Sequence, residues 1–521
     1  MKQDQPAQTD IQASQTEVTR RSFMQLAGAG LAAGATAYAG GCSGKPIGGN
    51  GWVPDQYEGT GNFPVQVRGR VPIDPRNVTI MRNNEKCILC GQCAEVCNRV
   101  EAVMGHYELP LVDDIPCIGC GQCTLWCPTG SITERDDTAA FLKALDDPDV
   151  HVVVQTAPST RVALAEEFGM SVGTNVEGKQ VAALKALGCD QVFDTNFAAD
   201  LTIVEEATEL VKRIKGEVKL PIPMFTSCCP GWVKFCEYFY PQLIPNLSTA
   251  RSPMSMLSPL IKTFYAEKNG IDPKKIFSVA IMPCTAKKFE ASRPEMNNAG
   301  VKLGDSSIRD TDLVLSTREL AKALKIKGID LMSLEDATYD KLMSEYSGAG
   351  AIFGATGGVM EAAVRTAYFY ITGENPPKSL YELVPVRGLA GIKSANLDVP
   401  GVGEIRIAVV SGMANAKKVL EQLKNAPDSW HFMEFMACPG GCISGGGQPK
   451  SSIPPSDPVR AARTNAIYSI DERMTLRLSH ENQEIQTLYK EYLEETPNGH
   501  IAHELLHTHH YEDRSMRLIA K

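Results

Sequence analysis

FSVAIMPC, residues 277–284, is a short apolar run that ends directly in a cysteine. Longer segments with helical periodicity alternate with such runs, including LTIVEEATELVKRIK (201–215) and VKFCEYFYPQLI (233–244). Short buried strands that alternate with helices predict an α/β domain with a largely parallel sheet from about residue 136 onward. The other runs that read as buried strands are HVVVQTAPS (151–159), DQVFDTN (190–196), IPMFTSCC (222–229) and IRIAVVSG (405–412).

Two of these predicted strands end in cysteine. In open α/β sheets, ligands bind at the carboxyl ends of the strands, where the loops gather. We therefore expect Cys228, Cys229 and Cys284 to converge on one crevice. The segment CPGGCISGGGQP (438–449) follows the apolar run FMEFMA (432–437), so that it can join them there.

The composition limits the classes of function. The chain has 521 residues, of which 43% are hydrophobic, which predicts several domains with a large core. Beyond the N-terminus no apolar run is long enough to span a bilayer. A net charge of -9 argues against nucleic acid as a partner. The 16 cysteines suit either disulfides or metal ligands, and their spacing favours metal.

The N-terminal segment TRRSFMQLAGAGLAAGATAYAGGC (19–42) places Arg20 and Arg21 ahead of a charge-free apolar stretch. This pattern predicts a twin-arginine export signal over residues 1–42, and a periplasmic protein or one on the outer face of the cytoplasmic membrane. An amphipathic helix is the alternative, but the stretch has no polar face. The small residues before Cys42 resemble a lipobox, whose cleavage would leave a lipid anchor, and cleavage after Ala39 competes with it. Residues 43–75 are rich in Gly and Pro and predict an extended tether.

Two cysteine runs between residues 76 and 135 share one spacing, C-x2-C-x2-C-x3-C. Bacterial ferredoxins with two cubane clusters have this pattern, and the fourth cysteine of each run binds the other cluster. The runs therefore predict a small α+β domain with two [4Fe-4S] clusters that pass single electrons. Two zinc sites are the alternative, which eight cysteines in this doubled order disfavour. Asn98 departs from the usual proline, which affects a turn and no ligand. One cluster would take Cys87, Cys90, Cys93 and Cys127, and the other Cys97, Cys117, Cys120 and Cys123.

Three segments resemble the signature segments of the [FeFe]-hydrogenases, in that family's order: TSCCPGW (226–232), MPCTAKKFE (282–290) and EFMACPGGCISGGGQP (434–449). The resemblance covers nearly everything after residue 75. It implies a catalytic domain at 136–455 and a small-subunit-like helical tail at 456–521.

The resemblance also implies the active site, the H-cluster. This is a cubane joined through one cysteine sulfur to a di-iron unit with CO, cyanide and a bridging dithiolate amine. Cys229, Cys284, Cys438 and Cys442 would bind the cubane, with Cys442 as the bridge. The glycines after Cys442 would let the backbone approach this large centre.

By the same resemblance, Cys228 is the acid/base group that faces the bridging amine, and Lys287 is the cation that anchors a cyanide. Its neighbour Lys288 is expected in solvent. The family passes protons through two glutamates, a serine and the active cysteine, which correspond here to Glu206, Glu209, Ser248 and Cys228. Taken alone, Glu206, Glu209 and Arg213 at helical spacing are more typical of a solvated helix face.

Apolar side chains near the motifs are core residues by default. The resemblance makes Met282, Met436 and Phe353 walls around the di-iron ligands. Met254 stands where the family usually has glutamine.

Three further patterns carry less weight. HELLH (503–507) matches a zinc-protease pattern, but it lies in SHENQEIQTLYKEYLEETPNGHIAHELLHTHHY (479–511), which resembles the small-subunit-like tail. GAGAIFGATGG (348–358) lacks nucleotide-loop spacing. Cys189 and Cys236 have no partner at motif spacing and are expected as buried hydrophobic residues.

These patterns together predict an enzyme that interconverts H2 with two protons and two electrons. Electrons would pass through two cubanes to an external iron–sulfur protein or cytochrome. The alternatives are a non-catalytic iron–sulfur scaffold and a hydrogen-sensing protein of the same fold. Cys228, Lys287 and the GGGQP segment argue for the enzyme, because a scaffold has no use for them.

Overall fold

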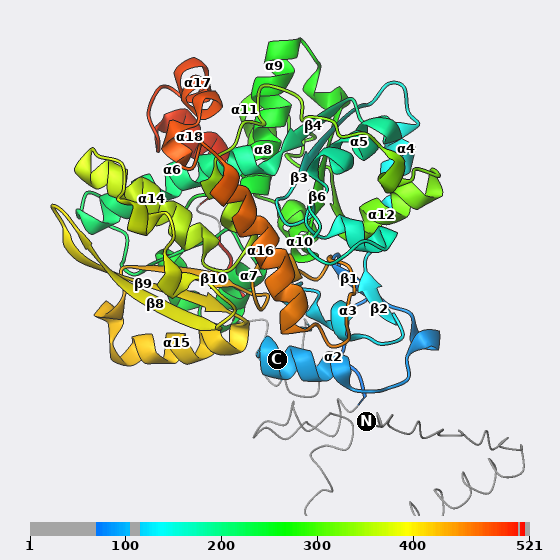
Figure 1. Cartoon of the computed structure of the whole chain (residues 1–521), viewed down its shortest axis with the longest axis horizontal. Coiled ribbons are helices and arrows are strands. Elements are labelled where there is room, and N and C mark those ends of the chain that lie inside the picture. The colour runs from blue at the N-terminus through cyan, green and yellow to red at the C-terminus, as the bar shows by residue number, and fades with distance from the viewer. Residues whose placement is uncertain (1–68, 105–114, 509–510, 516–521) are drawn as a thin grey trace, which may run out of the picture. The chain divides into compact units, whose positions relative to one another are not determined.

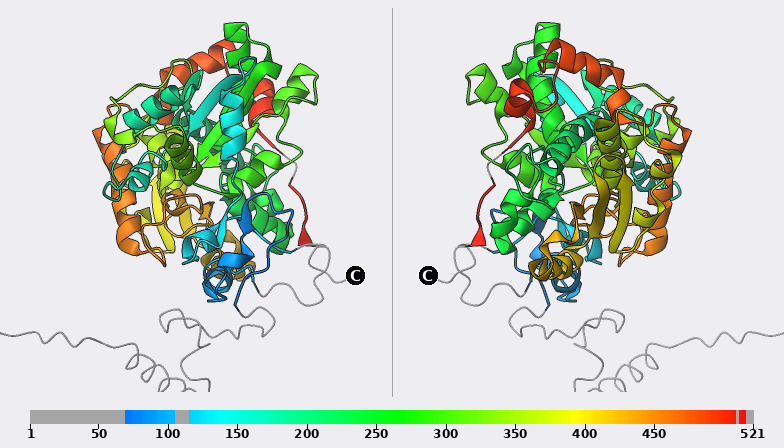
Figure 2. Two further views of the ribbon diagram at one scale, coloured as in Figure 1. Left: turned by 90° about the vertical axis from the view of Figure 1, so that its right-hand side faces the viewer. Right: turned by 90° about the vertical axis from the view of Figure 1, so that its left-hand side faces the viewer.

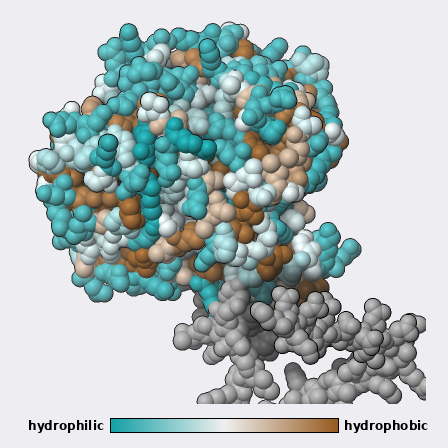
Figure 3. All heavy atoms as spheres, viewed as in Figure 1, coloured by the Kyte–Doolittle hydropathy of each residue, from teal (hydrophilic) through white to brown (hydrophobic). Residues whose placement is uncertain are grey.

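The computed structural model describes residues 69–104, 115–508 and 511–515. The predicted export signal, Cys42 and most of the predicted tether lie outside these residues. The described residues belong to one compact unit, in which the cysteine-rich segment packs beside the α/β core (Figure 1). No helix in this described part is long and apolar enough to cross a membrane. The face drawn in Figure 3 mixes hydrophilic and hydrophobic residues.

The first sheet has the strand order β4-β3-β6-β7 and is parallel throughout. Its strands are β3 (His151–Thr156), β4 (Gln191–Asp194), β6 (Ile276–Met282) and β7 (Leu313–Ser316). Helices α5 (Glu177–Leu187) and α12 (Thr317–Ile326) share one hydrophobic core with it, and α6 (Thr195–Ile214) and α8 (Pro253–Leu260) share another. The strands are buried on both faces, which explains their continuous apolar runs.

The second sheet has the order β5-β10-β9-β8. Its strands are β5 (Met224–Phe225), β8 (Ile392–Val399), β9 (Gly403–Ser411) and β10 (Phe432–Met436). β10 runs parallel to both of its neighbours, whereas β8 pairs antiparallel with β9 at the edge. One core joins this sheet to α7 (Pro230–Phe239) and α15 (Met413–Asn425), and another joins it to α14 (Gly358–Thr372). The predicted class, an α/β core with largely parallel sheets, is confirmed, and the core is divided between two sheets.

One predicted helix is shorter than its apolar pattern. The stretch 233–244 was expected as a single helix, but α7 ends at Phe239 and a 3-10 turn follows at Pro241–Asn246. Pro241 explains the break, because a proline disfavours helical backbone in the residue before it. Conversely, α6 begins at Thr195, six residues before the predicted stretch, where the Asp194 carboxylate accepts the amide of Asn196 at 2.9 Å.

The cysteine-rich segment is a small unit with one antiparallel pair, β1 (Ile80–Arg82) and β2 (Ile132–Glu134). Two short helices, α2 (Gln92–Glu95) and α3 (Gln122–Trp126), lie between these strands in the sequence, and a π-helical turn follows α2 at Val96–Val100. The remaining helices of the core are α4 (Thr138–Leu145), α9 (Ala266–Asn269), α10 (Ala286–Ser292), α11 (Asn298–Leu303) and α13 (Gly348–Ala351).

The C-terminal tail forms α16 (Asp457–Arg473), α17 (Gln483–Glu491) and α18 (His500–Leu506). α17 buries Ile485, Leu488 and Tyr489 against the core that contains α6 and α8. After α18 the chain continues along residues 248–251 and α7, and this segment is red in both views of Figure 2. The tail therefore packs closely on the α/β core.

Candidate active site

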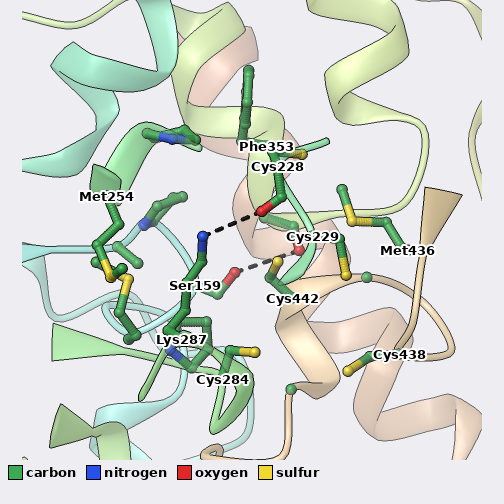
Figure 4. Close-up of a pocket in the computed structure, with 18 of the residues that line it drawn as sticks. Ser159, Cys228, Cys229, Met254, Cys284, Lys287, Phe353, Met436, Cys438 and Cys442 are labelled. Atoms are coloured by element: carbon green, nitrogen blue, oxygen red, sulfur yellow. Dashed lines mark hydrogen bonds between the residues drawn. The ribbon is translucent and has the colours of Figure 1, made fainter. Parts of the chain in front are cut away.

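The structure brings the predicted cysteines together in one cavity of about 710 Å³. Cys228 and Cys229 follow β5, Cys284 follows β6, and Cys438 follows β10. Cys442 completes the lining from the next turn (Figure 4). The cavity therefore lies at the carboxyl ends of strands from both sheets, as expected for an open α/β core. The amide of Ala437 donates to the Cys229 sulfur at 3.3 Å.

The rest of the cavity wall is mainly apolar. Met254, Met282, Met436 and Phe353 all line it and are almost fully buried. The side chains of Met254 and Met436 lie on opposite sides of the cysteine cluster in Figure 4. Phe353 belongs to the glycine-rich stretch 348–358, which forms α13, a 3-10 turn and the start of α14. This stretch therefore supplies the cavity wall.

Lys287 brings a positive charge to the cavity. Its Nζ donates to the Glu290 carboxylate at 2.6 Å. It also donates to the Cys228 carbonyl at 3.2 Å (Figure 4). Burial disfavours the charged ammonium, but Glu290 outweighs it and holds the pKa of Lys287 above its ordinary value. Ser252 and Ser255 donate to the other oxygen of Glu290, at 2.6 and 2.9 Å. Sequence reasoning missed this carboxylate, although it is the last residue of the quoted MPCTAKKFE segment.

The expectation that Lys288 lies in solvent was wrong. Its ammonium pairs with Asp137 at 2.6 Å and with Glu319 at 2.9 Å, and its side chain is 5% exposed. The adjacent Lys287 faces the cavity, whereas Lys288 faces the other way and ties α10 to α12. Lys287 and Lys288 are adjacent and of the same type, so only the direction of each side chain in the folded structure distinguishes them.

Glu206, Glu209 and Arg213 lie on a buried face of α6, so the alternative of a solvated helix face is wrong. One Glu209 oxygen accepts three hydrogen bonds of 3.0 Å, from the Ser248 hydroxyl and from the amide and hydroxyl of Thr249. The other oxygen accepts the Arg213 Nε at 3.0 Å. Both Glu206 oxygens are buried and accept no hydrogen bond of standard geometry from the described residues. The structure thus gathers the predicted relay residues around one point.

The two carboxyls have opposite pKa shifts. Burial, strengthened by the nearby charge of Glu209, raises the pKa of Glu206 to about 8. Burial acts on Glu209 in the same sense, but the charge and hydrogen bonds of Arg213 outweigh it and lower the pKa of Glu209. Glu206 is therefore a neutral acid and Glu209 an anion at neutral pH. Burial, with Glu206 next in effect, also raises the pKa of the Cys228 thiol.

Two smaller cavities contain the eight cysteines of the ferredoxin-like segment. One, of about 440 Å³, is lined by Cys97, Cys117, Cys120 and Cys123. The other, of about 290 Å³, is lined by Cys87, Cys90, Cys93 and Cys127. The fourth cysteine of each run thus joins the other run, in the crossed arrangement that the spacing predicts. All fifteen cysteines of the described residues are free of disulfides.

The glycines after Cys442 have a second role that the sequence did not indicate. A Cβ on Gly446 would lie 2.3 Å from the Cys120 carbonyl oxygen, and one on Gly445 would lie 2.3 Å from that of Pro283. Their close approach is thus to protein backbone, where the ferredoxin-like segment meets the cavity. Burial raises the pKa of Cys120, and the charges of Glu101 and Cys438 add to this effect. The larger of the two small cavities is therefore adjacent to the main one.

The HELLH segment has a structural setting unlike a zinc site. The His507 Nε2 lies 2.9 Å from the Glu205 carboxylate, and its Nδ1 lies 2.8 Å from the Thr249 hydroxyl. Both ring nitrogens are therefore engaged within the protein. Sequence reasoning missed Thr249, although it follows Ser248 directly. Cys189 and Cys236 are buried, as expected.

A large cysteine-lined cavity beside two smaller ones defines an iron–sulfur redox protein. Comparison with known families is consistent with this class. Residues 150–446 match the family "Iron only hydrogenase large subunit, C-terminal domain", and residues 457–514 match "Iron hydrogenase small subunit". The chain belongs to the iron-only hydrogenase family, and hydrogenases are oxidoreductases.

Individual relatives agree with the family. The chain is 42% identical over 452 residues to iron hydrogenase 1 of Clostridium pasteurianum, which covers 84% of this chain and 76% of the relative. It is 44% identical over 370 residues to the periplasmic [Fe] hydrogenase large subunit of Nitratidesulfovibrio vulgaris, which covers 65% of this chain and 86% of the relative. A solved variant of [FeFe]-hydrogenase HydA1 from Chlamydomonas reinhardtii matches with a TM-score of 0.63 and 41% identity, covering 73% and 99%. The chain is also 30% identical over 407 residues to cytosolic iron-sulfur assembly component 3 of Bos taurus, which covers 76% of this chain and 83% of the relative.

Proposed function

We propose that this protein is an [FeFe]-hydrogenase that interconverts H2 with two protons and two electrons. The observation that carries the proposal is the cavity where Cys229, Cys284, Cys438 and Cys442 converge beside Cys228 and Lys287. Its relatives named hydrogenases, at 42–44% identity, support the same activity.

The cavity suits the H-cluster. Four thiols meet there, apolar side chains exclude water, and a single ammonium suits anionic cyanide ligands. We assign Cys229, Cys284, Cys438 and Cys442 as cubane ligands, with Cys442 as the bridge to the di-iron unit. When bound, this group supplies a Lewis-acidic iron and an amine base for splitting H2 heterolytically. The walls are assigned to Met282, Met436 and Phe353.

Cys228 is the proposed acid/base group. Four ligands suffice for the cubane, so this fifth thiol is available, and it faces the same cavity. Its raised pKa keeps it a neutral thiol that can give a proton and then take one back. Lys287 is fixed by Glu290 so that its ammonium stays in the cavity wall.

Protons would pass between Cys228 and the interior of α6. Glu206 lies near enough to Cys228 that its charge would raise the pKa of the thiol. As a neutral acid, Glu206 can donate to the Ser248 hydroxyl, which itself donates to Glu209 at 3.0 Å. The order Cys228, Glu206, Ser248, Glu209 therefore carries each proton from a donor to an acceptor.

Electrons would pass through two [4Fe-4S] clusters. The cluster of Cys97, Cys117, Cys120 and Cys123 lies on the side of Cys438 and comes first. The cluster of Cys87, Cys90, Cys93 and Cys127 comes second, next to Ile88 and Leu89, whose side chains are 61% and 48% exposed. An external iron–sulfur protein or cytochrome would take the electrons there.

We also propose the domain division and location predicted above: an export signal (1–42), a tether (43–75), a ferredoxin-like domain (76–135), a catalytic domain (136–455) and a tail (456–521). Support for export comes from the twin arginines and from the relative named a periplasmic hydrogenase. A lipid anchor at Cys42 would hold the enzyme to the membrane surface.

The test is an infrared spectrum of protein produced anaerobically with the cluster-maturation machinery. Bands of iron-bound CO and cyanide that shift under H2 are expected. Their absence from a matured sample with intact cubanes would favour the scaffold, a function compatible with the assembly-component relative. Bands that respond to H2 without turnover would favour the hydrogen sensor.

A further inference from the structure

The proposed proton path ends at Glu209. The neighbouring Arg213 cannot carry a proton further. Arg213 is the donor in its hydrogen bonds to Glu209 and to the carbonyls of residues 221, 245, 246 and 247. A guanidinium has no acceptor and stays protonated in proteins. A proton on Glu209 therefore needs a neighbour that can both accept and donate.

Thr249 is such a neighbour. Its hydroxyl lies 3.0 Å from the Glu209 carboxylate and 2.8 Å from the His507 Nδ1. The other ring nitrogen of His507 lies 2.9 Å from the Glu205 carboxylate. The His507 and Glu205 side chains are both fully buried, so Glu209, Thr249, His507 and Glu205 form a continuous buried row of four groups that are able to accept and donate protons.

The tail is built onto this row. Residue His507 pairs antiparallel with Ala250, the Thr508 amide donates to the Thr249 carbonyl at 2.8 Å, and the Tyr511 hydroxyl donates to the Ser248 carbonyl at 2.8 Å. The row ends near the surface. Glu205 accepts the Asn498 amide at 2.8 Å, and residues 494–496 of that loop are exposed.

We propose that Thr249, His507 and Glu205 extend the proton path from Glu209 to the surface, so that the C-terminal tail supplies a relay residue. The inference rests on the proposed function, because a relay needs protons from the cavity. It gives the HELLH histidine a role other than zinc binding.

The step balances as a chain of proton transfers. Protonated Glu209 gives its proton to the Thr249 oxygen, and the Thr249 hydroxyl gives its own to the His507 Nδ1. The imidazolium then gives its Nε2 proton to Glu205, which releases it to water. This leaves the ring with its proton on Nδ1, as the other neutral tautomer. The net change is the transfer of one proton from Glu209 to Glu205, with no redox step, and every transfer runs in reverse for proton uptake.

The surroundings of the imidazole favour this role. Glu205 also accepts the Tyr489 hydroxyl and the Asn498 amide, and these two hydrogen bonds hold its side chain in place beside the ring. The His503 ring lies against His507, tilted by 35° and with ring centroids 4.2 Å apart. The titratable and charged groups around the ring are Glu205, Glu209 and Arg213 on α6, Tyr489 on α17, His503 on α18, and Arg251 before α8.

The experiment compares Thr249→Val with Thr249→Ser in the matured full-length enzyme. Valine keeps the shape but removes the hydroxyl, whereas serine keeps the hydroxyl. We expect turnover of the valine variant to fall by about tenfold or more with an altered pH profile, and serine to stay near wild type. His507→Ala should show the same loss and recover with added imidazole. His503→Ala is the control for removing a neighbouring ring.

Two readouts do not use turnover. The infrared bands of iron-bound CO and cyanide should be unchanged in every variant. In wild type we expect an infrared band of a buried carboxyl group that changes under H2. This band should be absent from Glu205→Gln, and in Thr249→Val it should not change under H2. Intact bands with wild-type turnover and pH profile in Thr249→Val would overturn the relay and leave the proposed function standing. A wild-type enzyme without bands that respond to H2 would overturn both.

Discussion

Replacing Glu209 tests the centre of the proton path. Its carboxylate accepts five hydrogen bonds from Ser248, Thr249 and Arg213, four of 3.0 Å and one of 2.5 Å from the Arg213 Nη2. Glu209→Ala removes all five and leaves the buried Arg213 guanidinium without its carboxylate. Breaking a buried ion pair in this way costs about 3–5 kcal/mol of folding free energy. Loss of activity in the alanine variant would therefore mix proton transfer with stability.

Glu209→Gln separates the two effects. Its amide oxygen can still accept from Ser248 and Thr249, and Arg213 keeps its carbonyl partners, including that of Leu247 at 2.8 Å. We expect a loss of about 1–3 kcal/mol in the free energy of unfolding. Glutamine takes up no proton at neutral pH, so turnover should still fall by about 100-fold or more.

The assay measures H2 evolution and dye-linked H2 oxidation, with the infrared spectrum and thermal unfolding of the same preparation. The expected result is wild-type CO and cyanide bands, a modest fall in melting temperature and a large fall in turnover in both directions. Wild-type turnover in Glu209→Gln with intact bands would refute the path, because the path contains no other residue that can take the place of the lost carboxyl.

Three further predictions concern other parts of the site and fold. Cys228→Ala should keep the infrared bands and lose about 100-fold or more in turnover, and turnover near wild type would remove the thiol from the mechanism. Burial raises the pKa of Glu206 from 4.5 to about 8, so folding holds a proton that the unfolded chain has lost, and wild type loses stability as pH rises through this window. Glu206→Gln should therefore gain stability relative to wild type as pH rises from 4.5 to about 8. If the melting temperatures of variant and wild type differed by the same amount at every pH, the raised pKa of Glu206 would be contradicted. In the tail, Asp471 pairs with the buried Arg365 at 2.9 Å, so Asp471→Ala should cost about 3–5 kcal/mol in chemical denaturation, and a loss below about 1 kcal/mol would show that the pair is dispensable.

Much of the site was predictable because its chemistry is local in the sequence. A cubane needs cysteines at short, regular spacing, so the runs from Cys87 and Cys117 could be interpreted without a fold. The cysteines after β5 and β6 were expected as neighbours because ligands bind at the carboxyl ends of strands, but these strands belong to different sheets, and only the packing of the two sheets brings the cysteines together. The alternation of apolar runs with helices indicated the α/β class in the same way.

The relay on α6 could not be interpreted in this way. Helix α6 buries residues on nearly every side, so the spacing of Glu206 and Glu209 does not indicate whether their face is buried or exposed to solvent. The directions of Lys287 and Lys288 depend on Glu290 and Glu319, which approach from different elements.

The sequence alone therefore determined the class of fold, the cysteines proposed to bind clusters and the family resemblance, since each depends on residue type and spacing along the chain. Only the tertiary structure decided which charged groups are buried, where Gly446 meets Cys120, and that His507 reaches Thr249 across 258 positions of sequence. The physical reason is that burial and hydrogen bonding depend on which distant elements pack together, and no local spacing records that packing.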